Sequence, residues 1–212
     1  MTTSKNFTAG FVNRRQVCAL GLGLYGLAAV GSAAAQSGAR AVRATPPELE
    51  AFKQASAPWQ FSGMGALRFF GFKAYDAILW TAGPAVNPLL AKSLFALEIE
   101  YNTSVKAEDI VNVSLLEMAR LRRLTDAQLK SWTTEMQKTF PSVVSGDRLT
   151  GVYVPKIGTR FFLNGRLISE INDTAFGDAF FAIWLDEGTK RADLRRSLLG
   201  SAAAVQPPAA NN

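Results

Sequence analysis

The chain contains no histidine, and its single cysteine, Cys18, lies in the N-terminal apolar run. Without histidine, Ser–His and Cys–His nucleophile pairs and nearly all zinc, copper and non-haem iron sites are excluded. Beyond residue 35 there is no thiol, so disulfides, thiol nucleophiles and thiolate metal ligands are excluded too. Gly63-Met64-Gly65 lacks the third glycine of a phosphate-binding loop. The sequence therefore predicts neither a metal nor a cofactor.

Residues 1–35 have the composition of a cleavable signal peptide. Three basic side chains and no acidic one occur there, an apolar run covers residues 17–30, and small residues lead to Ala35. The run is shorter than the roughly 20 residues that cross a bilayer. We expect export to the periplasm, with cleavage near Ala35 and no stable membrane span afterwards. An uncut N-terminal membrane anchor is the alternative.

The pair Arg14-Arg15 resembles a twin-arginine export signal. The apolar run that follows is diluted with Gly and Ala, which is consistent with that route. The pair lacks the serine or threonine and the phenylalanine of the full pattern, so export of the unfolded chain is the alternative.

Cleavage would leave one domain with a substantial core. Three basic residues and no acidic one would be removed, so the formal net charge would fall from +6 to +3. No Lys/Arg run is interleaved with aromatics, and we expect no nucleic-acid partner. We divide the rest of the chain into a leader with a short helix at 36–54, a domain at 55–200 and a disordered Ala/Pro/Asn tail at 201–212.

Periodicity predicts an α+β domain. Apolar residues alternate with Glu98 and Glu100 at 95–101, which indicates a strand with one solvated face. The apolar, glycine-containing stretch 59–82 predicts two strands or one long bent strand, and Asn164-Gly165 predicts a hairpin. Several antiparallel strands with helices between them predict helices on one face of a sheet. Helices are expected at 48–54, 108–121, 125–138, 174–184 and 191–199.

Several stretches resemble chalcone isomerase-like proteins. Gly63–Trp80 is similar to the strand pair near the start of that family, whose core reads roughly Lys-Val-Tyr-x-Ala-x-Leu-Tyr, and Phe95–Tyr101 resembles the next strand. Ile171–Leu185, followed by Leu194–Gly200, is similar to the closing helices of the exported bacterial branch. Together the resemblance covers about residues 55–200.

This resemblance implies an open-faced β-sandwich, a large antiparallel sheet backed by a layer of helices, with a ligand cleft between them. Plant members close a flavanone ring there, related plastid proteins bind fatty acids, and in both an arginine on the early strand meets the ligand's oxygen or carboxylate. Arg68 is the counterpart in this chain. The tyrosine that assists this arginine in the fatty-acid-binding relatives falls on Trp80, and no tyrosine matches the one that follows the third strand in the catalytic relatives.

The residues themselves are consistent with a ligand site. By strict alternation Arg68 shares an apolar strand face with Phe70 and Phe72, where a guanidinium needs an anion: a protein carboxylate or a ligand headgroup. Tyr75 and Tyr101 are candidates for polar pocket contacts, or else strand tyrosines that only pack. The predicted ligand-binding residues are Arg68, Tyr75, Trp80 and Tyr101. Six aromatic residues are expected in the core: Phe161, Phe162, Phe176, Phe180, Phe181 and Trp184.

We therefore predict an exported protein that binds an apolar small molecule, such as a fatty acid, without catalysis or with weak catalysis. An isomerase acting on a chalcone-like or enone substrate is the alternative, with no catalytic residue assigned. A haem or pigment site would need Tyr75, Tyr101 or a methionine as the axial ligand.

Overall fold

The computed structural model describes residues 43–200 except 54, 56, 70, 84–86 and 91. The predicted signal peptide at 1–35 and the predicted tail at 201–212 lie outside these residues. Among the helices of the described part, none is long and apolar enough to cross a membrane.

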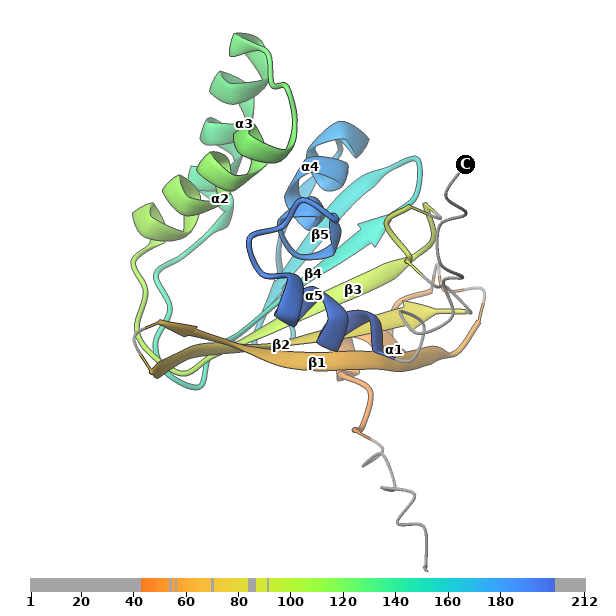
Figure 1. Cartoon of the computed structure of the whole chain (residues 1–212). Helices are drawn as coiled ribbons and strands as arrows, with labels where there is room; N and C mark the ends of the chain where they lie inside the picture. The colour runs from red at the N-terminus through yellow and green to blue at the C-terminus, as the bar shows by residue number, and fades with distance from the viewer. Residues whose placement is uncertain are drawn as a thin grey trace, which may run out of the picture. The chain divides into compact units, whose positions relative to one another are not determined.

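The six strands form one antiparallel sheet in which each strand pairs with the next one in sequence (Figure 1). The predicted stretch 59–82 is two strands that pair as a hairpin, and the expected α+β class is confirmed. The strands are β1 (Trp59–Phe69), β2 (Phe72–Ala82), β3 (Phe95–Tyr101), β4 (Arg148–Val154), β5 (Gly158–Leu163) and β6 (Arg166–Ile171).

Four of the five helices pack on one side of this sheet, above it in Figure 1. Two of them lie between β3 and β4 in sequence, and two follow β6. Thr125 begins α3 with the expected capping box, in which its hydroxyl accepts from Gln128 N–H. The helices are α1 (Pro47–Glu50), α2 (Ala107–Leu121), α3 (Asp126–Thr139), α4 (Thr174–Leu185) and α5 (Ala192–Leu199).

Glycine is required at two places in the sheet: the turn between β5 and β6, and the contact between β1 and α5. Asn164 and Gly165 connect β5 to β6 with φ of 49° and 84°, the left-handed values that a two-residue hairpin turn requires. On β1, a side chain at Gly63 would clash with the Ser197 carbonyl oxygen, and a Cβ at Gly65 would lie 2.7 Å from Leu194 Cδ1. Because Gly63 and Gly65 have no side chain, α5 can lie directly on β1.

The strand register divides side chains between two faces of the sheet, because successive residues of a strand point to opposite sides. Leu67 pairs with Tyr75, and Tyr75 with Tyr101, so these three lie in one row on the face that α2–α5 cover. Glu98 pairs with Ile78 and belongs to the opposite face.

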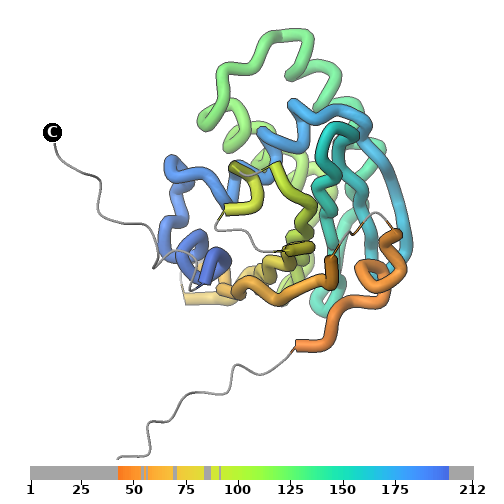
Figure 2. The backbone as a smooth tube through the Cα atoms, turned by 90° about the vertical axis from the view of Figure 1, so that its right-hand side faces the viewer, coloured from red at the N-terminus to blue at the C-terminus, as the bar shows by residue number. Residues whose placement is uncertain are grey.

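The expected layer of helices on one face is confirmed, and the N-terminal segment 43–52 in addition covers the central part of the second face. Leu49 of α1 packs with Ile78, Trp80 and Val152 in a second, smaller core. Figure 2 shows this orange segment and the blue α5 on opposite sides of the strands.

The same segment buries carboxylates, which corrects the expected solvation of Glu98. The Glu98 side chain is 1% exposed and accepts from Trp80 Nε1 at 3.1 Å and Arg43 Nη2 at 3.5 Å. Nearby, the buried Glu48 carboxylate accepts from Arg148 Nη2 at 3.0 Å and Thr150 Oγ1 at 3.0 Å. Side chains of the protein, rather than water, therefore provide the hydrogen-bond partners of these two carboxylates.

Burial of Glu98 gives a pH-dependent stability. Removal from water raises the pKa of Glu98, against the opposing influence of the Arg148 and Arg43 guanidiniums. The folded state then holds the proton more tightly than the unfolded state, so this contribution to stability is complete at low pH and lost as pH rises through the folded pKa. We expect the stability advantage of wild type over Glu98→Gln to be smaller at about pH 7.5 than at about pH 4. Urea unfolding at both pH values measures it.

The matched control for this experiment is Glu100→Gln. This substitution removes the half-exposed carboxylate that binds the same Arg43 guanidinium at 3.0 Å. An advantage over Glu98→Gln that grows with pH would contradict the prediction.

Candidate active or binding cavity

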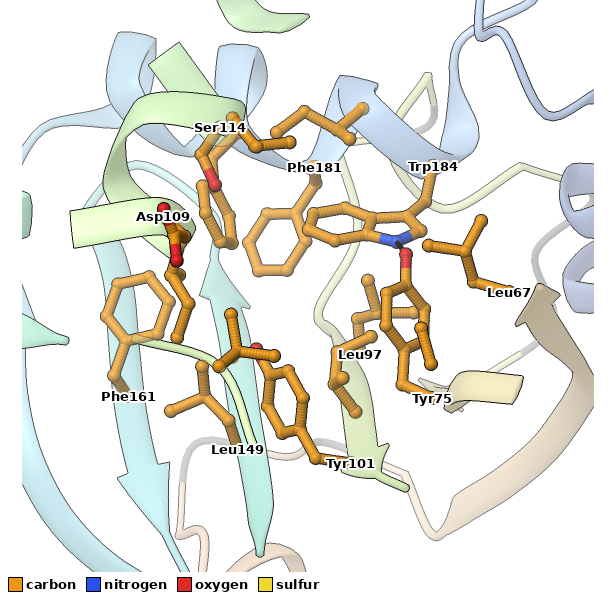
Figure 3. A pocket seen from close by; sticks show the side chains of 18 residues that line it. Leu67, Tyr75, Leu97, Tyr101, Asp109, Ser114, Leu149, Phe161, Phe181 and Trp184 are labelled. Atoms are coloured by element: carbon orange, nitrogen blue, oxygen red, sulfur yellow. Dashed lines mark hydrogen bonds between the residues drawn. The ribbon is translucent and has the colours of Figure 1, made fainter. Parts of the chain in front are cut away.

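A cavity of about 250 Å³ lies between the sheet and the helix layer (Figure 3). Its floor is formed by strand residues on the face that carries Tyr75 and Tyr101, and its roof by α2 and α4. The apolar floor residues are Leu67, Ala74, Leu97, Ile99, Leu149, Gly151 and Phe161; those of the roof are Ile110, Val113, Phe180, Phe181, Ile183 and Trp184.

The cavity exists because α2 is held away from the strands. α2 packs on α3 and α4 rather than on the sheet. Gly151, in the middle of the floor, faces the rings of Phe161 and Phe181, which an added Cβ would approach to 3.3 and 3.1 Å. The missing side chain therefore lets these two rings pack closely on β4 at one wall of the cavity.

The cavity opens beside the N-terminal half of α2. Two residues of this helix, Asp109 and Val113, line the cavity and are also exposed, Val113 by 61%. A ligand could therefore enter along α2 without unfolding the sheet.

Tyr75 and Trp184 join the floor to the roof. Trp184 Nε1 donates a hydrogen bond of 3.0 Å to the Tyr75 hydroxyl oxygen, as the dashed line in Figure 3 shows. Burial raises the pKa of Tyr75 to about 12, although this hydrogen bond and the charge of Arg191 act in the opposite direction. Tyr75 is therefore a neutral phenol at physiological pH.

Tyr101 and Ser114 present hydroxyl groups to the cavity from opposite sides, Tyr101 from β3 and Ser114 from α2 (Figure 3). Each residue is 8% exposed. The Tyr101 ring packs edge-on against Tyr75 at 6.2 Å between centroids, and burial raises the pKa of its hydroxyl. Among the described residues, neither hydroxyl has a hydrogen-bond partner.

The structure separates the four predicted ligand-binding residues. Tyr75 and Tyr101 line the cavity, whereas Arg68 and Trp80 do not. Trp80 is buried in the core on the opposite face of the sheet, where it donates to Glu98. Its position cannot serve a ligand in this cavity.

The expected apolar strand face around Arg68 was wrong. The chain turns after β1, so Phe72 lies on the returning strand opposite Phe69 and is 80% exposed. Arg68 pairs with Lys73 and is exposed, while its neighbour Leu67 faces the cavity. A ligand-binding role of Arg68 stays a prediction that its placement does not support.

Sequence reasoning missed Asp109 and Ser114 and assigned Trp184 only to the core. Ser114 lies four residues after Ile110 on the buried side of α2. A small polar residue on the apolar face of an amphipathic helix was the available signal.

The charge content of the wall is low. Within the described residues, no group of three His, Cys, Asp or Glu side chains could hold a metal, and no Lys or Arg lines the cavity. The polar groups of the wall are therefore hydroxyls, one indole N–H and the Asp109 carboxylate.

Together, the fold and the cavity define an α+β protein in which an open antiparallel sheet and a helix layer enclose an apolar space. A sequence model of the chalcone isomerase-like family matches residues 46–200. The chain therefore belongs to the chalcone isomerase-like family.

The known proteins that are similar to this chain include a plant protein of known structure and a bacterial relative. The crystal structure of a fatty-acid binding protein of Arabidopsis thaliana superposes with a TM-score of 0.55, over 69% of this chain and 89% of that one, at 12% identity, which shows a shared fold. An uncharacterized protein of Haemophilus influenzae is 30% identical over 104 residues, 49% of this chain and 50% of that protein. The chain thus matches this relative over half of the relative's length.

The Tyr75–Trp184 hydrogen bond predicts a measurable coupling between floor and roof. In a double-mutant cycle of Tyr75→Phe and Trp184→Phe, followed by urea unfolding, we expect a coupling of about 0.5–1.5 kcal/mol. The same cycle with Tyr101→Phe is the control, because the Tyr101 hydroxyl does not bond Trp184. Equal coupling in both cycles would show that the hydrogen bond is not its origin.

Proposed function

We propose that this protein binds one apolar small molecule in the cavity between the sheet and helices α2 and α4. The observation that carries the proposal is the open apolar space of about 250 Å³, lined by aliphatic and aromatic side chains. The volume lies just below the usual range of ligand pockets, roughly 300–1,000 Å³. The fold is shared with a protein named for fatty-acid binding, which favours a lipid-like or similarly apolar ligand.

The free energy gained by burying apolar surface favours an apolar ligand in this cavity. Each buried methylene contributes about 0.8 kcal/mol, so roughly eight of them give on the order of 6 kcal/mol before the costs of ordering the ligand. The aromatic roof residues Phe180, Phe181 and Trp184 form a rigid contact surface, since successive rings pack at centroid distances of 5.4 Å. A preformed surface of this kind lowers the cost of binding.

An isomerase acting on a chalcone-like or enone substrate is the second candidate. It is favoured by the Tyr101 hydroxyl, a proton donor without a partner among the described residues that faces the cavity. Tyrosine is an established type of general acid. The absence of a lining cation among the described residues disfavours strong polarisation of a substrate oxygen.

Filling the cavity should weaken binding strongly. In Ser114→Phe a ring replaces the hydroxymethyl group that faces the space, and we expect the affinity for the neutral fluorophore N-phenyl-1-naphthylamine to fall at least tenfold. Fluorescence titration measures it, and native mass spectrometry of wild type purified without delipidation identifies a co-purifying ligand. Ala119→Phe, on an exposed position of the same helix, is the matched control.

Three outcomes separate the candidates. Saturable binding by wild type and Ala119→Phe, lost in Ser114→Phe, supports the binding function. Consumption of a chalcone followed by absorbance, and lost in Tyr101→Phe, would favour the isomerase instead. If wild type neither binds the probe saturably nor carries a co-purifying ligand, the binding proposal is refuted, whatever the variants show.

The proposal includes export to the periplasm through a signal peptide at residues 1–35, as in an exported bacterial branch of the family. The supporting features are the basic start, the apolar run and the small residues before Ala35. The twin-arginine pair favours a route that carries folded proteins, so a ligand bound in the cytoplasm would cross with the protein.

Expression of the full chain in a Gram-negative host tests the export proposal. We expect a periplasmic product that begins near residue 36, by intact mass, and accumulation of the precursor in Arg14→Lys/Arg15→Lys. An unchanged yield of mature protein from this variant would refute the twin-arginine route, and a periplasm without product from wild type would refute export. Lys5→Arg, which keeps the basic charge outside the pair, is the control.

A further inference from the structure

Two hydroxyl groups inside the cavity indicate which end of a ligand would be buried. Tyr101 and Ser114 are each 8% exposed and direct their hydroxyls into the space (Figure 3). No described residue accepts from or donates to either of them. Neither hydroxyl oxygen is among the fully buried unpartnered atoms of the described residues, so both stay accessible from the cavity and can bond a group that enters it.

The partner that fits them is a small oxygen group. A hydroxyl can donate one hydrogen bond and accept others, so Tyr101 and Ser114 can each bond a carbonyl oxygen or a hydroxyl of a ligand. Tyr75 is different, because its hydroxyl oxygen already accepts from Trp184 at 3.0 Å. The remaining wall is apolar and would contact the rest of the ligand.

A carboxylate finds no counter-ion in this wall. No described lining residue is a lysine or arginine. Arg191 acts electrostatically on Tyr75, but its guanidinium holds both Asp193 oxygens, at 3.1 and 2.8 Å, and the Arg68 carbonyl oxygen at 3.4 Å. Arg68 itself is exposed and its neighbour Leu67 takes the place in the floor.

The opening adds a second obstacle to anions. Asp109, at the exposed edge of the cavity, has no ion-pair partner among the described residues. An anionic headgroup would approach this carboxylate on entry and then lose its hydration without gaining a cation. Both effects disfavour an ionised acid, since an unpaired charge in an apolar medium is far more costly than a hydrogen-bonded hydroxyl or carbonyl.

We infer that the cavity selects neutral amphiphiles, in which a hydroxyl or ester carbonyl is bound by Tyr101 and Ser114, over ionised acids of the same chain length. This inference rests on the proposed binding function. It differs from the fatty-acid expectation in the headgroup alone, because the acyl chain meets the same apolar wall.

A matched ligand series tests the inference. Delipidated wild type is loaded with N-phenyl-1-naphthylamine at about pH 8, and 1-decanol, methyl decanoate and decanoate are compared as competitors. We expect the alcohol and the ester to displace the probe at concentrations at least tenfold below that of decanoate. Tyr101→Phe and Ser114→Ala should each weaken decanol several-fold relative to the probe affinity of the same variant, and Ala119→Phe, at an exposed position outside the cavity, is the control.

The converse variant supplies a cation. Leu67→Arg places a guanidinium in the floor position that faces the cavity, and decanoate should then gain at least tenfold in affinity. Asp109→Asn should favour decanoate by a few-fold at low salt, with little effect on decanol, since it removes the charge at the opening.

The outcomes distinguish this inference from the function on which it rests. Wild-type decanoate binding as tight as that of decanol would overturn the preference for neutral ligands while leaving the binding function intact. A preference for decanol that survives both Tyr101→Phe and Ser114→Ala would overturn the assignment of the headgroup to these hydroxyls. Failure of the probe and all three competitors to bind would instead refute the binding function. If Leu67→Arg does not fold, the wild-type series decides.

Discussion

Both faces of the central strands of the sheet are covered, so the alternation of side chains along these strands determines which of two buried layers a residue enters. On β3, Leu97, Ile99 and Tyr101 enter the cavity side, while Glu98 between them enters the second core. A shift of the register by one residue would exchange these sets and bring a carboxylate into the cavity. The hydrogen bonds that bury Glu98 therefore also keep the cavity floor apolar.

The cavity follows from unequal packing of the helices on this sheet. The two glycines of β1 let α5 lie directly on the strand, and the aromatic residues of α4 pack on Tyr153 of β4 and Phe161 of β5. α2 packs instead on α3 and α4, so it bridges the space above β3 rather than filling it. The helices around the cavity are thus held in place by contacts outside it, so the open volume does not depend on a ligand. Ligand pockets are usually preformed in this way.

The chalcone isomerase-like family and its fold account for the arrangement of strands and helices, but the charge of the cavity wall depends on single residues. One residue of β2, Ala74, is extra in the register between Leu67–Tyr75 and Arg68–Lys73. This bulge and the turn after β1 leave Leu67 on the cavity side and Arg68 outside. A difference of one position on the strand therefore decides between a site with a cation and a site with hydroxyls alone.

The sequence by itself determined the class of fold, the strand and helix segments, the Asn164-Gly165 hairpin, the Thr125 cap and two tyrosines of the cavity wall, because these depend on local periodicity and turn chemistry. It did not determine the burial of Glu98, the position of Trp80, the exposure of Arg68 or the role of Ser114. Each of these depends on what covers a face from a distant part of the chain: Arg43 and α1 over Glu98, and α2 over β3. Alternation shows that the two faces of a strand differ, but only tertiary packing decides which face is sealed and which one borders a cavity.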